Sequence, residues 1–158
     1  MSFALSSFSV VGFSGSRRGC SAAALSAAFS RVASGASVFV GCASGVDAVV
    51  RCRFGSRCRV FSASSRSRGG LAARSAGLVR AVAAAGGCWV SFPSCACPAG
   101  LVPSPVSGRC FCGFGSGSWA SLAFAVGLGV PCLVFSPWGV PAGWGFSALG
   151  RGWFVRVP

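Results

Sequence analysis

Short apolar runs alternate with Ala-rich segments along most of this chain, and that alternation restricts the fold more than any other feature. The segments between the runs, residues 21–34, 46–54, 71–86 and 118–129, have the composition of helices, and Ser21 is a candidate N-cap. Strands that alternate with helices predict βαβ units and a parallel sheet covered on both faces. The predicted strands are FSVVGF (8–13), SVFVGC (37–42), CRVFSA (58–63), CWVSFP (88–93) and PCLVFSP (131–137).

The fold class that follows is a three-layer, Rossmann-like α/β domain with an open, mostly parallel five-stranded sheet and helices on both faces. Residues 1–158 are expected to form one domain. Residues 94–112 form a Cys/Pro-rich insertion, and residues 138–158 an irregular tail in which WFVRV is a candidate edge strand. The apolar stretch 119–135 is short for a membrane span and is broken by GLGVP, so no membrane partner is expected.

The amino-acid vocabulary is restricted in a way that folding does not explain. Ile, Thr, Asn, Lys, Gln, His, Glu and Tyr are absent, and Asp47 is the only acidic residue. Every codon for the eight absent types contains adenine, whereas every frequent residue type here can be encoded without it. A folding constraint would not remove Ile and Thr, which favour strands, while keeping Val and Phe. The pressure therefore acts on the coding sequence, and the net charge of +13 is in part its by-product.

Three Gly- and Ser-rich loops follow predicted strands at the same end of the sheet. They are GFSGSRRG (12–19), GCASGVD (41–47) and GFGSGS (113–118). Ligands of open α/β sheets bind outside the carboxyl ends of the strands. Each loop leads into a helix whose N–H groups and dipole favour an anion, and the guanidinium of Arg17 suits a phosphate.

These loops together resemble the Rossmann-like domain of the DNA-processing Smf/DprA family, and more broadly the superfamily that joins it to the Lonely Guy phosphoribohydrolases. The similarity runs over about residues 8–137, through FSVVGFSGSR, VFVGCASGVDAVVR and GSGSWASLAFAVGLGVPCLVFSP. It implies binding of nucleotides, nucleotide-derived ligands or single-stranded DNA. The ligand-binding residues that the loops and the resemblance indicate are Gly15, Ser16, Arg17, Gly45, Asp47, Gly115, Ser116, Gly117 and Ser118.

The chain departs from both families where their chemistry is expected. Lonely Guy enzymes resemble G-G-x-G-T-x-x-E, and here Ser121 stands at the position of that Glu. DprA proteins resemble G-I-D-x-x-A-H, and here Arg51 stands near the position of the His. A chain with neither Glu nor His cannot assemble that catalysis, so no catalytic residue is predicted.

Several residues have two readings at this level. The Asp47 carboxylate could cap the helix that it begins or accept a ligand hydroxyl. Arg66, Arg68 and Arg74 could extend an anion-binding rim or form a solvated face. Trp119, Trp138, Trp144 and Trp153 could stack bases or simply pack. Four cysteines at the ends of the insertion could bind zinc, although their C-x-C spacing is not the usual one, or could be small apolar residues: Cys95, Cys97, Cys110 and Cys112.

The sequence thus predicts a cytoplasmic, non-catalytic protein that binds a phosphate-bearing nucleotide or nucleotide-derived ligand and requires no cofactor. The cysteine spacing does not suggest a secreted disulfide framework. The alternatives are a DprA-like protein that binds single-stranded DNA, and a nucleotide hydrolase with Asp47 as its sole carboxylate. The sequence also permits an oligomer.

The codon argument gives the first prediction. We expect the sense strand of the gene to be nearly free of adenine outside the start, the Asp47 codon and the stop. Ser and Arg provide the independent check, because both also have codons that contain adenine (AGY and AGR). Sequencing the gene decides: frequent AGC, AGA or AGG codons would place the bias in the protein instead.

Overall fold

The computed structural model describes residues 3–158, which form one mixed sheet with helices packed on it. The sheet has seven strands in the order β3-β2-β1-β4-β5-β7-β6. The strands are β1 (Val10–Gly15), β2 (Ser37–Gly41), β3 (Cys58–Phe61), β4 (Cys88–Phe92), β5 (Cys132–Phe135), β6 (Ser147–Gly150) and β7 (Trp153–Arg156). All pairings from β3 to β5 are parallel, as the alternating sequence predicts.

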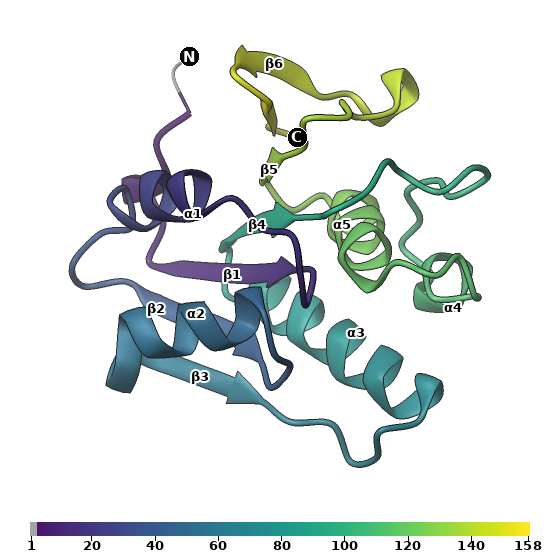
Figure 1. Cartoon of the computed structure of the whole chain (residues 1–158), viewed down its shortest axis with the longest axis horizontal. Helices are drawn as coiled ribbons and strands as arrows, with labels where there is room; N and C mark the ends of the chain where they lie inside the picture. The colour runs from purple at the N-terminus through teal and green to yellow at the C-terminus, as the bar shows by residue number, and fades with distance from the viewer. Residues whose placement is uncertain (1–2) are drawn as a thin grey trace.

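Helices cover both faces of the sheet, which gives the expected three layers (Figure 1). The helices are α1 (Ala22–Phe29), α2 (Val46–Phe54), α3 (Arg68–Ala84), α4 (Ser107–Cys110) and α5 (Gly117–Gly127). Residues 3–158 also contain three short 3-10 turns: η1 (Leu5–Ser7), η2 (Gly55–Arg57) and η3 (Ala142–Trp144). One core cluster lies between the sheet and α1 and α2, and the other lies under α3 and α5.

The hydrophobic alternation along the central strands explains this layering. In β1, Val11 and Phe13 belong to the core cluster on the α1 and α2 side. In β2, Val38 and Val40 join that cluster, whereas Phe39 between them joins the other. Because successive side chains of a strand point to opposite faces, a strand that is apolar throughout must be covered on both sides.

The carboxyl-terminal tail differs from expectation. The sheet has seven strands and not five, and the tail 138–158 is not irregular, because it contains β6 and β7. The WFVRV segment is a strand, as predicted, but not at the edge of the sheet: β7 lies antiparallel between β5 and β6. A short β-ribbon fits here because Gly150 and Gly152 take positive φ in the turn that joins its strands.

The strand order places a switch point between β1 and β4. The chain first builds outward from β1 to β2 and β3, then crosses through α3 to β4 on the other side of β1. At such a point the two connections leave the sheet in opposite directions and open a crevice at the carboxyl ends of the strands. Within residues 3–158, no helix is long and apolar enough to cross a membrane.

The buried thiols generate a prediction about stability. Burial raises the pKa of Cys88 and of Cys132, so the folded state holds both protons more tightly than the unfolded chain. The stabilisation that this gives is fully present below pH 9, the ordinary thiol pKa, and is lost as the pH rises above it. Under reducing conditions, the free energy of unfolding should therefore fall above pH 9 by about 1.4 kcal/mol per pH unit for each such thiol.

Urea unfolding at a series of pH values measures this slope. In the Cys132→Ala variant, the fall of the unfolding free energy with pH should be less steep than in the wild type. In Cys52→Ala it should be unchanged, because Cys52 is exposed. A slope that is the same in all three proteins would contradict this assignment to buried thiols.

Candidate functional site

A cleft of about 620 Å³ opens at the switch point and brings the three predicted loops together. Its walls come from the end of β1, from Trp89 of β4, from α3, from the start of α5 and from the insertion 94–112. The insertion itself carries the short helix α4, and its Ser94, Cys95 and Phe111 line the cleft. The predicted residues that line the cleft are Gly15, Ser16, Arg17, Asp47, Gly115, Ser116, Gly117 and Ser118.

Gly45 is the predicted residue that does not line the cleft, and its role is to join two loops. Its φ is +75°, and a side chain there would collide with the backbone of Ser16 and Arg17. The Ser16 carbonyl accepts a hydrogen bond from Val46 N at 3.2 Å, and the Ser16 hydroxyl accepts one from Ser94 N at 3.0 Å. Through these two hydrogen bonds Ser16 joins the first loop to the second and to the insertion. Its position in the GSR motif of the first loop gives no sign of either bond.

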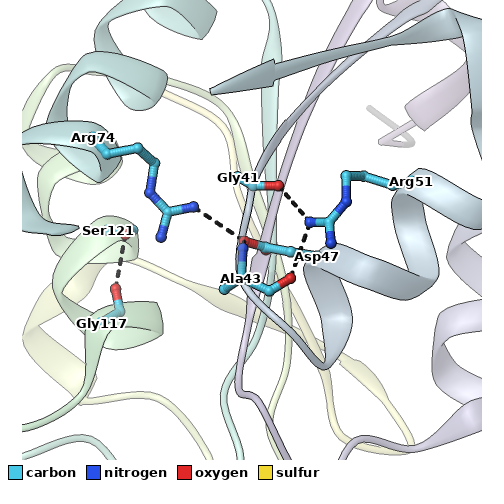
Figure 2. A network of polar contacts seen from close by, with 7 residues as sticks. All are labelled: Gly41, Ala43, Asp47, Arg51, Arg74, Gly117 and Ser121. Carbon is cyan, nitrogen blue, oxygen red and sulfur yellow. Dashed lines mark hydrogen bonds and ion pairs between the residues drawn. The ribbon is translucent and has the colours of Figure 1, made fainter. Parts of the chain in front are cut away.

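Asp47 forms a buried ion pair with Arg74 (Figure 2). Its Oδ2 lies 3.2 Å from Arg74 Nη1 and also accepts a bond from Ala43 N at 3.2 Å. The two side chains are only 8% and 9% exposed. Asp47 belongs to α2 and Arg74 to α3, on opposite faces of the sheet, so the pair joins the two helix layers at the carboxyl end of β2.

This geometry corrects two expectations. Asp47 does not cap α2: Gly45 is the N-cap, and the carboxylate bonds an N–H of the preceding loop. A solvated face is also wrong for Arg74, although Arg66 and Arg68 are exposed. The sequence pointed to Asp47 as a special residue but gave no signal for its partner, because ion pairing over 27 residues leaves no local pattern.

Arg51 fixes the second loop from the other side (Figure 2). Its Nη1 donates to the carbonyl of Gly41 at 2.8 Å and to that of Ala43 at 3.0 Å. Gly41 must lack a side chain, because a Cβ there would overlap the Arg74 guanidinium. Charge-assisted bonds to carbonyls are among the stronger hydrogen bonds, so they hold the loop in one conformation. The residue near the family's His position is therefore a structural arginine.

The start of α5 presents backbone donors to the cleft. Ser116 is its N-cap and accepts from Trp119 N at 3.4 Å. The first bond within the helix runs from Ala120 N to Ser116 O, which leaves the N–H groups of Gly117 and Ser118 as the unpaired donors of a helix start. Ser121 lies one turn on, and its hydroxyl donates to Gly117 O at 2.8 Å (Figure 2). Lonely Guy enzymes have a Glu at this position, whereas the Ser121 hydroxyl here bonds a carbonyl of its own helix.

Charge and apolar surface are both present in the cleft. Arg17 and Arg68 are exposed at its rim, and Arg74 lies deeper. Leu71 and Phe114 contribute apolar wall. Since the carboxylate of Asp47 is already paired with Arg74, the cleft as a whole is cationic. Such a site attracts an anion with an apolar or aromatic portion.

The four cysteines of the insertion do not form a metal centre in the part of the chain that the structure describes. Among residues 3–158, no three His, Cys, Asp or Glu side chains are arranged to hold a metal ion. Cys95 and Cys112 are exposed, whereas Cys110 is buried. Burial, with Cys95 nearby, raises the pKa of Cys97 to about 11. A thiol in that state is protonated at neutral pH and is not a ready metal ligand.

The tryptophans divide clearly into packing and exposed residues. Trp119 and Trp144 are fully or almost fully buried and meet edge to face at 5.7 Å, and Trp119 Nε1 donates to Cys95 O. Trp153 packs against Phe92 and Phe135. Trp138 is 53% exposed. Base stacking is therefore an option for Trp138 alone among the four.

The ion pair gives a third prediction. Removing one partner leaves a buried charge unpaired, so Asp47→Asn and Arg74→Leu should each lower the free energy of unfolding by about 3–5 kcal/mol. The double variant should lose less than the sum, by roughly 0.5–3 kcal/mol, because the two residues are coupled. Urea unfolding of all four proteins measures the coupling. Arg66→Ala, an exposed arginine, is the control and should change stability by less than about 0.5 kcal/mol. Strict additivity would mean that the pair does not interact.

The chain matches no protein-family model, no curated protein and no solved structure. The resemblance to DprA and Lonely Guy proteins therefore rests on the loop motifs alone. The structure itself shows an open α/β fold with a mixed, mostly parallel sheet and helices on both faces.

Proposed function

We propose that this chain is a non-catalytic binding protein for a phosphate-bearing nucleotide or nucleotide-derived ligand. The observation that carries the proposal is the convergence of donors at the switch-point cleft. Arg17, Arg74 and the free N–H groups at the start of α5 all belong to its lining. Cationic side chains and helix N-termini are the usual partners of a phosphate.

Two buried donors strengthen this reading. Arg74 Nε and Trp89 Nε1 lie in residues that line the cleft, and neither finds an acceptor among residues 3–158. A buried N–H without an acceptor costs about 1–3 kcal/mol. Both atoms are buried, so a ligand would have to displace part of the cleft wall to offer them an acceptor oxygen and remove that cost.

Asp47 is a poor candidate for a general base. Its Oδ2 already accepts from Arg74 and from Ala43 N. A base must lie within hydrogen-bond reach of the proton that it removes and be free to take it. We therefore favour a positioning role, in which Asp47 holds the Arg74 guanidinium beside the bound ligand.

A second candidate is binding of single-stranded DNA, favoured by the exposed arginines around the cleft. Arg17 and Arg68 line it, and Arg18 and Arg66 lie exposed beside them in the chain. A strand would contact several of these groups at once and release counterions, so its affinity should fall steeply with salt. A single phosphate on a nucleotide should show a much shallower dependence.

The fourth prediction compares two adjacent arginines. Arg17→Ala should weaken nucleotide binding by about 1.5–3 kcal/mol, the range for a hydrogen bond to a charged group. Arg18→Ala removes the same charge next to it, but Arg18 does not line the cleft, so this variant should bind almost as well as the wild type. Calorimetric titration with a panel of nucleotides measures both.

Both variants should melt like the wild type, because both side chains are exposed. Equal losses in Arg17→Ala and Arg18→Ala would indicate a general effect of charge, as expected for a strand. Unchanged affinity in Arg17→Ala would remove the phosphate site from the first loop.

A further inference from the structure

A second, smaller hollow lies beside the cleft, and its lining is mostly apolar. Its volume is about 410 Å³. Phe92 and Phe135 come from the ends of β4 and β5, and Trp138 closes one side. The complete lining is Gly19, Cys20, Ser21, Phe92, Pro93, Phe135, Pro137 and Trp138.

Trp138 is held in the open by a rigid turn. It is the one exposed aromatic side chain in residues 3–158. Two hydrogen bonds close the turn Ser136–Gly139. Gly139 N donates to Ser136 O at 3.1 Å, and the Ser136 hydroxyl donates to Gly139 O at 2.8 Å. Ser136 N in turn donates to Gly152 O at 2.8 Å, which anchors the turn to the β-ribbon. The backbone that carries the indole is therefore held in place, and a partner that stacks on the ring need not order the loop.

The linings of the hollow and of the cleft meet at two places in the chain. Pro93 lines the hollow and Ser94, the next residue, lines the cleft, so their Cα atoms are about 3.8 Å apart. The first loop contributes to both, with Arg17 in the lining of the cleft and Gly19 and Cys20 in that of the hollow. A molecule with an anionic end and a flat aromatic end could occupy both at once.

We propose that this hollow is a nucleobase subsite, in which the base of a mononucleotide stacks on Trp138 while its phosphate is held in the cleft beside Arg17. The inference rests on the proposed function and adds where the base lies. The cleft has aromatic wall of its own at Phe114, but that ring is partly buried against the core cluster under α3 and α5, whereas the Trp138 ring is free to stack. Every nucleobase has a π-face, so the subsite selects for a base and not for one particular base.

The test compares adenosine 5′-monophosphate with ribose 5-phosphate, which differ only by the base, using calorimetric titration. Trp138→Ala should weaken binding of the nucleotide by about 5- to 150-fold, the range for loss of one base–aromatic stack. It should leave ribose 5-phosphate unchanged. Trp138→Phe should keep most of the affinity, because it keeps a ring. Leu149→Ala removes another exposed apolar side chain, on β6 and outside both cavities, and should bind both ligands as the wild type does.

The outcomes separate the two proposals. Nucleotide affinity that survives in Trp138→Ala but falls in Phe114→Ala would place the base in the cleft and overturn the subsite, with the phosphate site intact. Failure of both small ligands to bind would overturn the proposed function and the subsite together. Binding of oligo(dT) with no binding of the mononucleotide would overturn the proposal of a mononucleotide ligand. It would favour single-stranded DNA that lies across both cavities.

Discussion

The ion pair between Asp47 and Arg74 is the interaction on which the carboxyl edge of the sheet depends. It joins α2 on one face to α3 on the other, and its carboxylate also fixes the loop between β2 and α2 through Ala43 N. That loop in turn supports the first loop, because Val46 N bonds the Ser16 carbonyl. The cleft is therefore shaped by one charged contact and by the loops that it holds in place. A serine could replace a capping Asp at little cost, but it could not neutralise a buried guanidinium.

A chain with a single acidic side chain must place its other arginines without ion pairs to side chains; some are exposed, and others are held in two ways. Arg51 and Arg57 donate to backbone carbonyls, as between Arg57 and the carbonyls of Ala33 and Ala36. Arg59 lies over the rings of Phe39 and Phe61, and Arg80 over that of Phe124. Carbonyl bonds and cation–π contacts hold the guanidinium while leaving its charge uncompensated. The positive field therefore persists, and it is strongest where several arginines meet.

How much of this could be read from the sequence depends on how local each signal is. The strands β1 to β5 and the helices between them follow from apolar runs and Ala-rich segments, and Ser21 caps α1 as predicted. In the carboxyl-terminal ribbon, WFVRV predicts the strand β7, but β6 is not predicted, because its four residues are all exposed and show no alternation. Loop positions were predictable from the carboxyl-end rule, and most of the predicted site residues line one cleft. The ion pair of Arg74 and the hydrogen bonds of Ser16 could not be predicted, since both join segments that are distant in the chain.

The same restricted vocabulary limits what the cleft can do chemically. Its polar groups are guanidinium, hydroxyl, thiol, indole N–H and backbone N–H, and its one carboxylate is already engaged with Arg74. Such a set donates far more hydrogen bonds than it accepts, so it complements a ligand whose surface consists of acceptor oxygens. Its guanidinium groups do not release their protons, and its hydroxyl groups need a base before they can act as nucleophiles. This excess of donors is the physical reason why we propose a phosphate-bearing ligand for the cleft.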